Sequence, residues 1–252
     1  MNTPLSAVII THNAAGQLAD CLNSLAFVSE IIILDSGSDD GTKDIADFFN
    51  SRFIHQEWLG YGPQKQRAVE LATNDWVLCL DADERISDEL AASIQSELKK
   101  PGFQAYQFPR CNRFMRRWLR HGEGYPDISI RLFNRNIAQW SDDAVHEVVQ
   151  TEIPVADLKG DLLHDSATSL SGYLGKQNQY TSLQAEKLYL AGKRAGAGKL
   201  IFNPLFRFFK FYFFRLGLLD GVPGLIHILI GCQNTFIKYA KLIALQRINQ
   251  IN

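Results

Sequence analysis

The chain has 252 residues, which is enough for one large α/β domain or two smaller ones with a sizeable buried core. Hydrophobic residues make up 46% and charged residues 21%, and this balance excludes an intrinsically disordered or collagen-like chain. The net charge of −1 hides an asymmetry, because residues 201–252 carry a net +5 and residues 1–200 a net −6. We therefore expect an acidic body with a basic, apolar tail.

The four cysteines lie far apart in the sequence and form neither a C-x-x-C motif nor a cluster with histidines. This spacing argues against a disulfide framework and against structural zinc, and it favours a reducing compartment. The first ten residues lack the basic start and long apolar stretch of a signal peptide, so we expect them to begin a strand and the chain to stay in the cytoplasm.

The first hundred residues alternate short apolar runs with helical periodicity. Strands are predicted at 7–10, 31–34, 52–54 and 76–80, and helices at 18–25, 42–49, 63–71 and 87–98. Thr42 and Ser87 are expected to cap two of these helices, and Pro63 suits the first turn of another. This repeated order predicts an α/β fold with a largely parallel sheet that is covered on both faces.

The second half of the chain reads differently. Shorter strands are predicted at 105–108, 128–133, 145–149 and 158–163, and the chain becomes helical beyond residue 171. We expect a catalytic domain over residues 1–168 and a helical region over residues 169–252.

Polar side chains follow three of the predicted strands. They are Thr11 with Asn13, the stretch 35–40, and Asp81 with Asp83. Ligands of open α/β sheets bind at the carboxyl ends of the strands, so these clusters are candidates for one site. A turn or helix cap remains an equal interpretation for the acidic residues at 39 and 40.

Of these clusters, the Asp81-Ala-Asp83 triplet most requires an explanation, because it places two carboxylates close together. If the strand continues through it, both carboxylates point to the same face and repel each other unless a cation or hydrogen-bond donors hold them. Oxygen ligands of this kind suit Mg²⁺ or Mn²⁺ shared with the phosphates of a substrate. A solvated turn before the next helix is the alternative.

The motifs at 6–13, 31–42 and 62–84, taken in this order and spacing, resemble the family 2 glycosyltransferases. The resemblance implies the nucleotide-sugar-binding GT-A fold and an inverting reaction that uses a divalent metal, Mg²⁺ or Mn²⁺. It also implies a UDP-sugar site formed by Thr11, Asn13, Asp35, Lys65, Arg67 and Asp81. Asp83 would bind the metal with Asp81 beside it, and His164 is a candidate to complete the metal shell.

Two positions depart from the family pattern. The chain reads Asp35-Ser-Gly-Ser where many members have Asn-Asp-Gly-Ser, and Ala68 stands near a position that the family usually gives to glycine. The first departure moves the carboxylate by one residue, which leaves its partner open.

Further motifs resemble the lipopolysaccharide inner-core glucosyltransferase branch of that family. They lie at 125–133, 145–147, 160–164 and 215–224. This resemblance implies transfer of glucose from UDP-glucose to a heptose of the lipopolysaccharide core.

An inverting transfer needs a base to take the proton of the acceptor hydroxyl. Glu147, next to His146, is the first candidate for this base and Asp127 the second. An exposed, polar strand end is the alternative reading of the His146-Glu147 pair.

Five arginines lie within eleven residues, from Arg110 to Arg120, between aromatic side chains. Guanidinium groups match phosphates well, so a phosphorylated, Kdo-bearing lipid A core would suit this patch, and so would anionic lipid head groups. We assign the acceptor phosphates to Arg113, Arg117 and Arg131. A solvated helix face is the alternative, and the acidic body argues against nucleic acid as a partner.

The tail combines aromatic bulk with basic charge, notably between residues 202 and 215. Charged and polar residues interrupt both apolar stretches, so we expect peripheral attachment to the cytoplasmic face of the inner membrane rather than a true span. Helices that pack on the body or on a second copy are the alternative.

Two other functions stay open at this point. One is a polyprenyl-phosphate glycosyltransferase, which also works at a membrane. The other is a catalytically silent membrane protein that only binds nucleotide or serves as a scaffold. A nucleotidyltransferase is disfavoured, because its Gly- and Arg-rich phosphate loop is missing.

Overall fold

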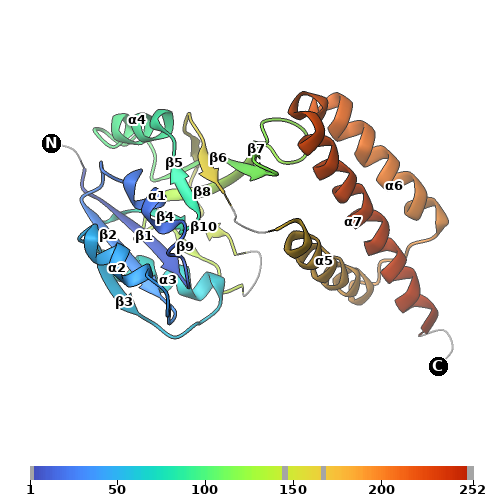
Figure 1. Cartoon of the computed structure of the whole chain (residues 1–252), viewed down its shortest axis with the longest axis horizontal. Coiled ribbons are helices and arrows are strands. Elements are labelled where there is room, and N and C mark those ends of the chain that lie inside the picture. Colours follow the sequence, from blue (N-terminus) through green and yellow to red (C-terminus); the bar gives the residue numbers. More distant parts are fainter. Residues whose placement is uncertain (1–2, 144–146, 166–168, 249–252) are drawn as a thin grey trace. The chain divides into compact units, whose positions relative to one another are not determined.

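The computed structural model describes residues 3–143, 147–165 and 169–248, and the chain forms two compact units (Figure 1). Unit 1 comprises residues 1–110 and 127–165, and unit 2 comprises residues 111–126 and 166–252. The expected division at residue 168 places the segment 111–126 in the catalytic domain, whereas the structure places this segment with the C-terminal helices. Contacts from Glu123 and His121 to those helices explain this placement.

Four parallel strands form the first part of unit 1. Their order across the sheet is β3-β2-β1-β4, with β1 at Leu5–Thr11, β2 at Glu30–Asp35, β3 at Arg52–His55 and β4 at Trp76–Asp81. All four strands lie where the apolar runs predict them.

Helices cover both faces of these strands, and the alternation of side chains divides the core in two. Leu18 and Leu90 pack with one set of strand residues, whereas Ala68 and Val69 pack with the other. The helices are α1 at Leu18–Asn23, α2 at Thr42–Phe48, α3 at Tyr61–Glu70 and α4 at Asp88–Glu97. Strands buried on both faces explain why β1, β2 and β4 read as continuous apolar runs.

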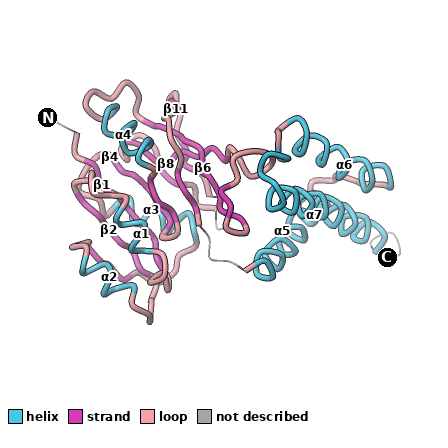
Figure 2. The backbone as a smooth tube through the Cα atoms, turned by 45° about the horizontal axis from the view of Figure 1, so that its top comes forward, coloured by secondary structure: helices cyan, strands magenta, loops and turns pink. Residues whose placement is uncertain are grey.

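Strands beyond β4 extend the sheet; β8, β6 and β7 pair in antiparallel fashion, and β11 runs parallel to β6. The order continues β8-β6-β12-β5, and β7 and β11 pair with β6 (Figure 2). The bounds are β5 Glu84–Ile86, β6 Ala105–Phe114, β7 Arg117–Trp118, β8 Asp127–Asn134, β11 Ala156–Asp157 and β12 Leu162–His164. A separate hairpin joins β9, Gln139–Trp140, to β10, Val149–Gln150. The strand expected at 145–149 lies partly outside the described residues.

The two expected helix caps differ in outcome. Ser87 caps α4, since its hydroxyl accepts a hydrogen bond from the Leu90 N–H at 3.3 Å. Thr42 does not cap α2, because it is the first helical residue and donates its hydroxyl to Asp40. Gly41 occupies the N-cap position, and the Asp40 carboxylate before it accepts the Thr42 N–H at 2.9 Å.

Unit 2 is helical apart from the hairpin between the end of β6 and β7. α7, Gly221–Ile248, packs against both α5, Leu170–Leu190, and α6, Ala197–Phe209 (Figure 2). A π-helical segment, η1 at Lys210–Phe214, and a 3₁₀ turn, η2 at Gly217–Asp220, connect α6 to α7.

By length and composition, none of the described helices is able to cross a membrane alone. Only the bent pair Ala197–Phe214 and Gly217–Ile248, with an angle of 75° between its arms, meets that requirement together.

Gly160 is predicted to be irreplaceable in the loop before β12. Its φ of +95° disfavours any L side chain, and a Cβ atom there would lie 2.3 Å from the Leu90 nitrogen. Gly160→Ala should therefore lower the free energy of unfolding by about 2–4 kcal/mol in urea titrations. Gly16→Ala, which meets nothing within 4 Å, should change it by less than about 0.5 kcal/mol; equal losses would contradict the packing argument.

Candidate active site

A cavity of about 680 Å³ opens where β1 and β4 end. This is where the strand order reverses, because the chain runs outward from β1 to β3 and then returns to the other side of β1. Thr11 and Asn13 line the cavity from the β1 side, and Asp81, Asp83 and His164 line it from the β4 side. The predicted clusters after β1 and β4 thus meet in one cleft.

The second predicted cluster, at the end of β2, supports the β1 loop. Asp35 is 2% exposed, and its carboxylate accepts hydrogen bonds from the Thr11 hydroxyl at 2.7 Å, from the N–H groups of Gly37 and Ser38, and from the Ser38 hydroxyl. Burial alone would raise the pKa of Asp35, but these donors lower it. Four bonds use the acceptor capacity of a carboxylate, so Asp35 holds this loop in place within the protein.

Asn13 stands in the left-handed region, with φ of 50°, and joins the two loops. Its side-chain oxygen accepts the Asp39 N–H at 3.0 Å, and its own N–H donates to the Ser38 hydroxyl at 2.8 Å. The stretch after β2 therefore acts as a scaffold for the cavity rim.

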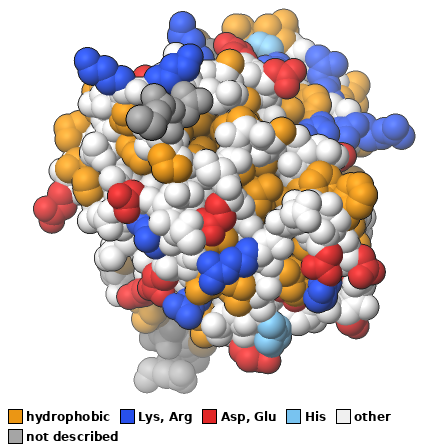
Figure 3. Space-filling view, turned by 90° about the vertical axis from the view of Figure 1, so that its left-hand side faces the viewer, with side chains coloured by type: hydrophobic (Ala, Val, Ile, Leu, Met, Phe, Trp, Pro, Cys, Tyr) orange, Lys and Arg blue, Asp and Glu red, His pale blue; other side chains and the backbone are white. Residues whose placement is uncertain are grey.

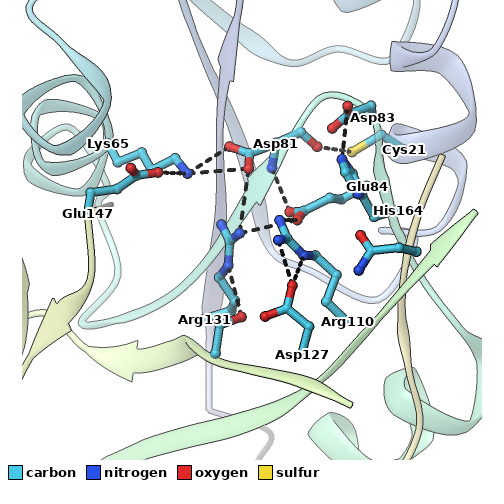
Figure 4. A network of polar contacts seen from close by, with 12 residues as sticks. Cys21, Lys65, Asp81, Asp83, Glu84, Arg110, Asp127, Arg131, Glu147 and His164 are labelled. Carbon is cyan, nitrogen blue, oxygen red and sulfur yellow. Dashed lines mark hydrogen bonds and ion pairs between the residues drawn. The ribbon is translucent and has the colours of Figure 1, made fainter. Parts of the chain in front are cut away.

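Asp81 is the centre of a charge network at the end of β4 (Figure 4). Lys65 from α3 approaches to 3.0 Å and Arg131 from β8 to 3.5 Å. Burial alone would raise the pKa of Asp81, but these two cations hold it well below its usual range. The Asp81 carboxylate therefore stays ionised.

Glu84 is the second carboxylate of this network. Its side chain is fully buried, accepts the Asp81 N–H at 2.9 Å, and pairs with Arg131 at 3.2 Å and Arg110 at 3.5 Å. The indole of Trp140 lies under both Lys65 and Arg131, at 4.9 and 5.5 Å from the ring centre. These contacts fix the direction of Asp81.

The two candidate bases lie on the edge of this network (Figure 4). Glu147 pairs with Lys65 at 2.8 Å and is 17% exposed, so one ammonium group links it to Asp81. Asp127 is 43% exposed and accepts two bonds from Arg110, at 2.6 and 2.9 Å. His146, the neighbour of Glu147, lies outside the described residues.

Asp83 and His164 are in contact with each other, and both line the cavity. Asp83 lies in the turn between β4 and β5, so the strand does not continue through the triplet and the two carboxylates do not share one strand face; the turn given as the alternative is what the structure has. Its carboxylate is 3.2 Å from the His164 Nε2. Burial lowers the pKa of His164, but the hydrogen bond and the charge of Asp83 raise it overall.

Asp83 and His164 are too few to hold a divalent cation alone, so a bound substrate would have to supply further oxygen ligands. Among residues 3–143, 147–165 and 169–248, no three His, Cys, Asp or Glu side chains gather as a metal centre. Mg²⁺ and Mn²⁺ commonly take one or two protein carboxylates and fill the other positions with phosphate oxygens and water. The Asp83 carboxylate on the cavity wall meets that description, and His164 could join it only with its ring deprotonated.

The four arginines predicted as site residues do not line the cavity. Arg67 is exposed and pairs with Glu70, because two residues along α3 turn it to the face opposite Lys65. Arg131 is 5% exposed and bonded to carboxylates, so it supports Asp81 instead of displaying its charge to an acceptor. Arg113 and Arg117 belong to unit 2.

Several contributors were not predicted from the sequence. Trp58 and Tyr61 line the cavity and contact each other edge to face at 4.9 Å, with about half of each side chain exposed. Glu84 and Arg110 brace the network from inside. In the sequence, the two aromatic residues on either side of Gly60 could have indicated this part of the site, since exposed rings are suited to stacking on a base or sugar.

Replacing Asp35 should destabilise the protein in a pH-dependent way. Because the pKa of Asp35 is lowered in the folded state, its contribution is present above the unfolded value and disappears as the pH falls through the folded one. Asp35→Asn should cost about 1–3 kcal/mol of unfolding free energy at pH 7 and progressively less in acid. Asp39→Asn, an exposed neighbour, serves as the control; a pH-independent loss would contradict this role.

Comparison with known proteins identifies the family of this chain. The glycosyl transferase family 2 model matches residues 6–151, which is more than half of the chain. The lipopolysaccharide core biosynthesis glycosyltransferase LpsC of Rhizobium meliloti is 33% identical over 95% of this chain and 92% of its own length.

Solved structures are more distant. TarS 1–349 of S. aureus has 14% identity and a TM-score of 0.47, covering 98% of this chain and 92% of that one. Glucosyl-3-phosphoglycerate synthase from Mycobacterium tuberculosis, crystallised with Mn²⁺ and UDP, has 22% identity and a TM-score of 0.37 and covers 45% of each chain.

The fold class expected from the sequence agrees with the sheet of unit 1 and with this family, so the GT-A assignment is confirmed. The expected resemblance to the lipopolysaccharide-core branch is confirmed by the match to LpsC. The chain belongs to glycosyl transferase family 2 and is a glycosyltransferase.

Proposed function

We propose that this glycosyltransferase moves glucose from UDP-glucose to a heptose of the lipopolysaccharide inner core, with inversion at the anomeric carbon. The observation that carries the proposal is the similarity to the lipopolysaccharide core enzyme LpsC, which extends over 95% of the chain and includes the helices of unit 2. Glucose as the donor sugar and heptose as the acceptor rest on the motif resemblance alone.

The cavity at the ends of β1 and β4 is the donor site in this proposal. Asn13 and the Trp58–Tyr61 pair line it and suit a nucleoside, and Asp81 and Asp83 line it as well. Asp83 and His164 would hold a divalent cation, which when bound neutralises the charge of the diphosphate leaving group. Asp81 stays ionised beside them and directs Lys65 toward the same place.

The transfer itself is a single displacement. The acceptor oxygen forms a bond to the anomeric carbon as the bond from that carbon to the diphosphate oxygen breaks and its electron pair leaves with UDP. The proton of the acceptor hydroxyl passes to a carboxylate oxygen. Glu147 is suited to this role, because its ion pair with Lys65 holds an oxygen near the carboxylates of the donor site.

Lys65 has a positioning role in this scheme. It is 4% exposed, lies over Trp140, and touches both the donor-site carboxylate of Asp81 and the candidate base Glu147. A single cation therefore sets the separation between the group that orients the donor site and the group that accepts the proton.

The enzyme would work at the cytoplasmic face of the inner membrane, where a lipid-linked core acceptor is presented. Residues 201–252 would attach it peripherally. Exposed aromatic side chains along α6, among them Phe202 and Phe206 at 68% exposure each, support this placement.

The Glu147→Gln variant tests the proposed base. Transfer should fall by about 10²–10⁴-fold, because the amide cannot accept the proton, while UDP affinity changes less than about threefold. The comparison variant is Asp127→Asn, which should retain most of the activity. UDP release by purified enzyme and calorimetric UDP binding give the two readouts; near-normal turnover of Glu147→Gln would place the base elsewhere.

A donor and acceptor screen tests the function. Purified enzyme should release UDP from UDP-glucose in the presence of truncated core lipid, and EDTA should abolish this release until Mg²⁺ or Mn²⁺ is restored. Transfer to polyprenyl phosphate instead, or no transfer with any UDP-sugar, would overturn the proposal.

A further inference from the structure

The two units carry opposite charge. Unit 2 has 15 Lys and Arg against 3 Asp and Glu, a net +12, whereas unit 1 has 11 against 24, a net −13. On the face of the molecule that Figure 3 shows, acidic and basic side chains are interspersed without a continuous basic patch. The excess positive charge therefore belongs to the unit that contains α5, α6 and α7.

Two of the three acidic residues of unit 2 form hydrogen bonds or ion pairs within that unit. Glu123 binds the Arg207 guanidinium, which also donates to Thr235 at 2.8 Å. Asp220 has 3% of its side chain exposed and accepts the N–H groups of Arg120 and His121. Arg207 is thus engaged inside the unit and is not a cation for lipid phosphates.

An apolar elbow, residues 213–222, joins η1 to α7. Leu216 has a positive φ of 55°, and Gly217 packs so closely on Phe211 and Ile228 that a Cβ atom would lie 2.4 Å from the Ile228 side chain. The chain turns sharply here, and the apolar side chains on either side of Gly217 are left in solvent. Their exposed fractions are Phe213 48%, Phe214 82%, Leu216 49%, Leu218 41%, Leu219 50% and Val222 67%.

An arginine-rich loop, residues 113–120, is fastened to this elbow. The Arg117 guanidinium donates to the Leu219 carbonyl at 3.0 Å, and Asp220 accepts the N–H groups of residues 120 and 121. At the tip of the hairpin Met115 and Arg116 both have positive φ, 48° and 65°, in a turn that favours Asn-Gly. This costly turn displays Met115, which is 49% exposed, beside an exposed arginine.

An apolar tip beside a group of cations is suited to an anionic lipid surface. The aliphatic and aromatic side chains can enter the acyl boundary while arginine and lysine remain among the phosphates. A symmetric dimer through this same surface is disfavoured, because two units of net +12 would meet.

We propose that the elbow, together with the arginine-rich loop, is the membrane-insertion point of this protein and that it selects anionic phospholipids. The inference rests on the proposed peripheral attachment. It replaces the whole of residues 201–252 as the membrane contact with the elbow and the arginine-rich loop, and it adds a preference for anionic lipids.

Vesicle flotation with the full chain tests the insertion point. Wild type should float with vesicles of phosphatidylcholine and phosphatidylglycerol, and poorly with phosphatidylcholine alone. Leu218→Asp/Leu219→Asp should weaken binding about tenfold or more, because two apolar groups lose their burial. Leu190→Asp is the matched control, since Leu190 is 85% exposed at the end of α5, and it should bind like wild type.

A second pair of variants tests the charge. Arg116→Gln/Lys210→Gln should weaken binding to anionic vesicles more than Lys187→Gln/Lys193→Gln does, and added salt should weaken wild-type binding. Thermal unfolding and UDP binding of every variant verify that the fold is intact.

Two outcomes would overturn the inference. One is equal wild-type binding to neutral and anionic vesicles, and the other is full binding by Leu218→Asp/Leu219→Asp. Transfer to a delipidated, soluble core acceptor is measured separately. Its absence in wild type would contradict the proposed reaction and leave the vesicle result standing.

Discussion

The ion pairs around Asp81 are the constraint on which the rest of the structure depends. A carboxylate at the end of a buried strand is unfavourable unless cations and donors surround it, and here Lys65 and Arg131 supply that charge from two different elements. Glu84 balances the arginine in turn and holds the Asp81 N–H. The network ties α3, β4, β5 and β8 together and leaves the edge of the cavity to Asp81 and Asp83.

The parts of the molecule that were predictable from the sequence are those set by local pattern. Apolar runs such as 31–34 and 76–80 are strands, because a sheet covered on both faces leaves no polar alternation. The polar residues after β1 and β4 meet at one cavity, because parallel strands end at the same edge. The family motifs then identified the class of enzyme.

The remaining features depend on contacts between residues far apart in the chain. Arg67 and Lys65 look equivalent in the sequence, but the turn of α3 separates them onto opposite faces. Arg131 resembles a surface arginine until its partner Glu84, 47 residues away, is placed. The exchange of 111–126 into the helical unit depends on Glu123 and His121 finding Arg207 and Asp220, which no local pattern indicates.

A structure of the enzyme with UDP and Mn²⁺ tests the central claim most directly. We expect the uridine in the cavity at the ends of β1 and β4, with the metal bound by Asp83 and the diphosphate, and with Lys65 still beside Asp81. A diphosphate bound away from both aspartates, with the cavity empty, would contradict the account.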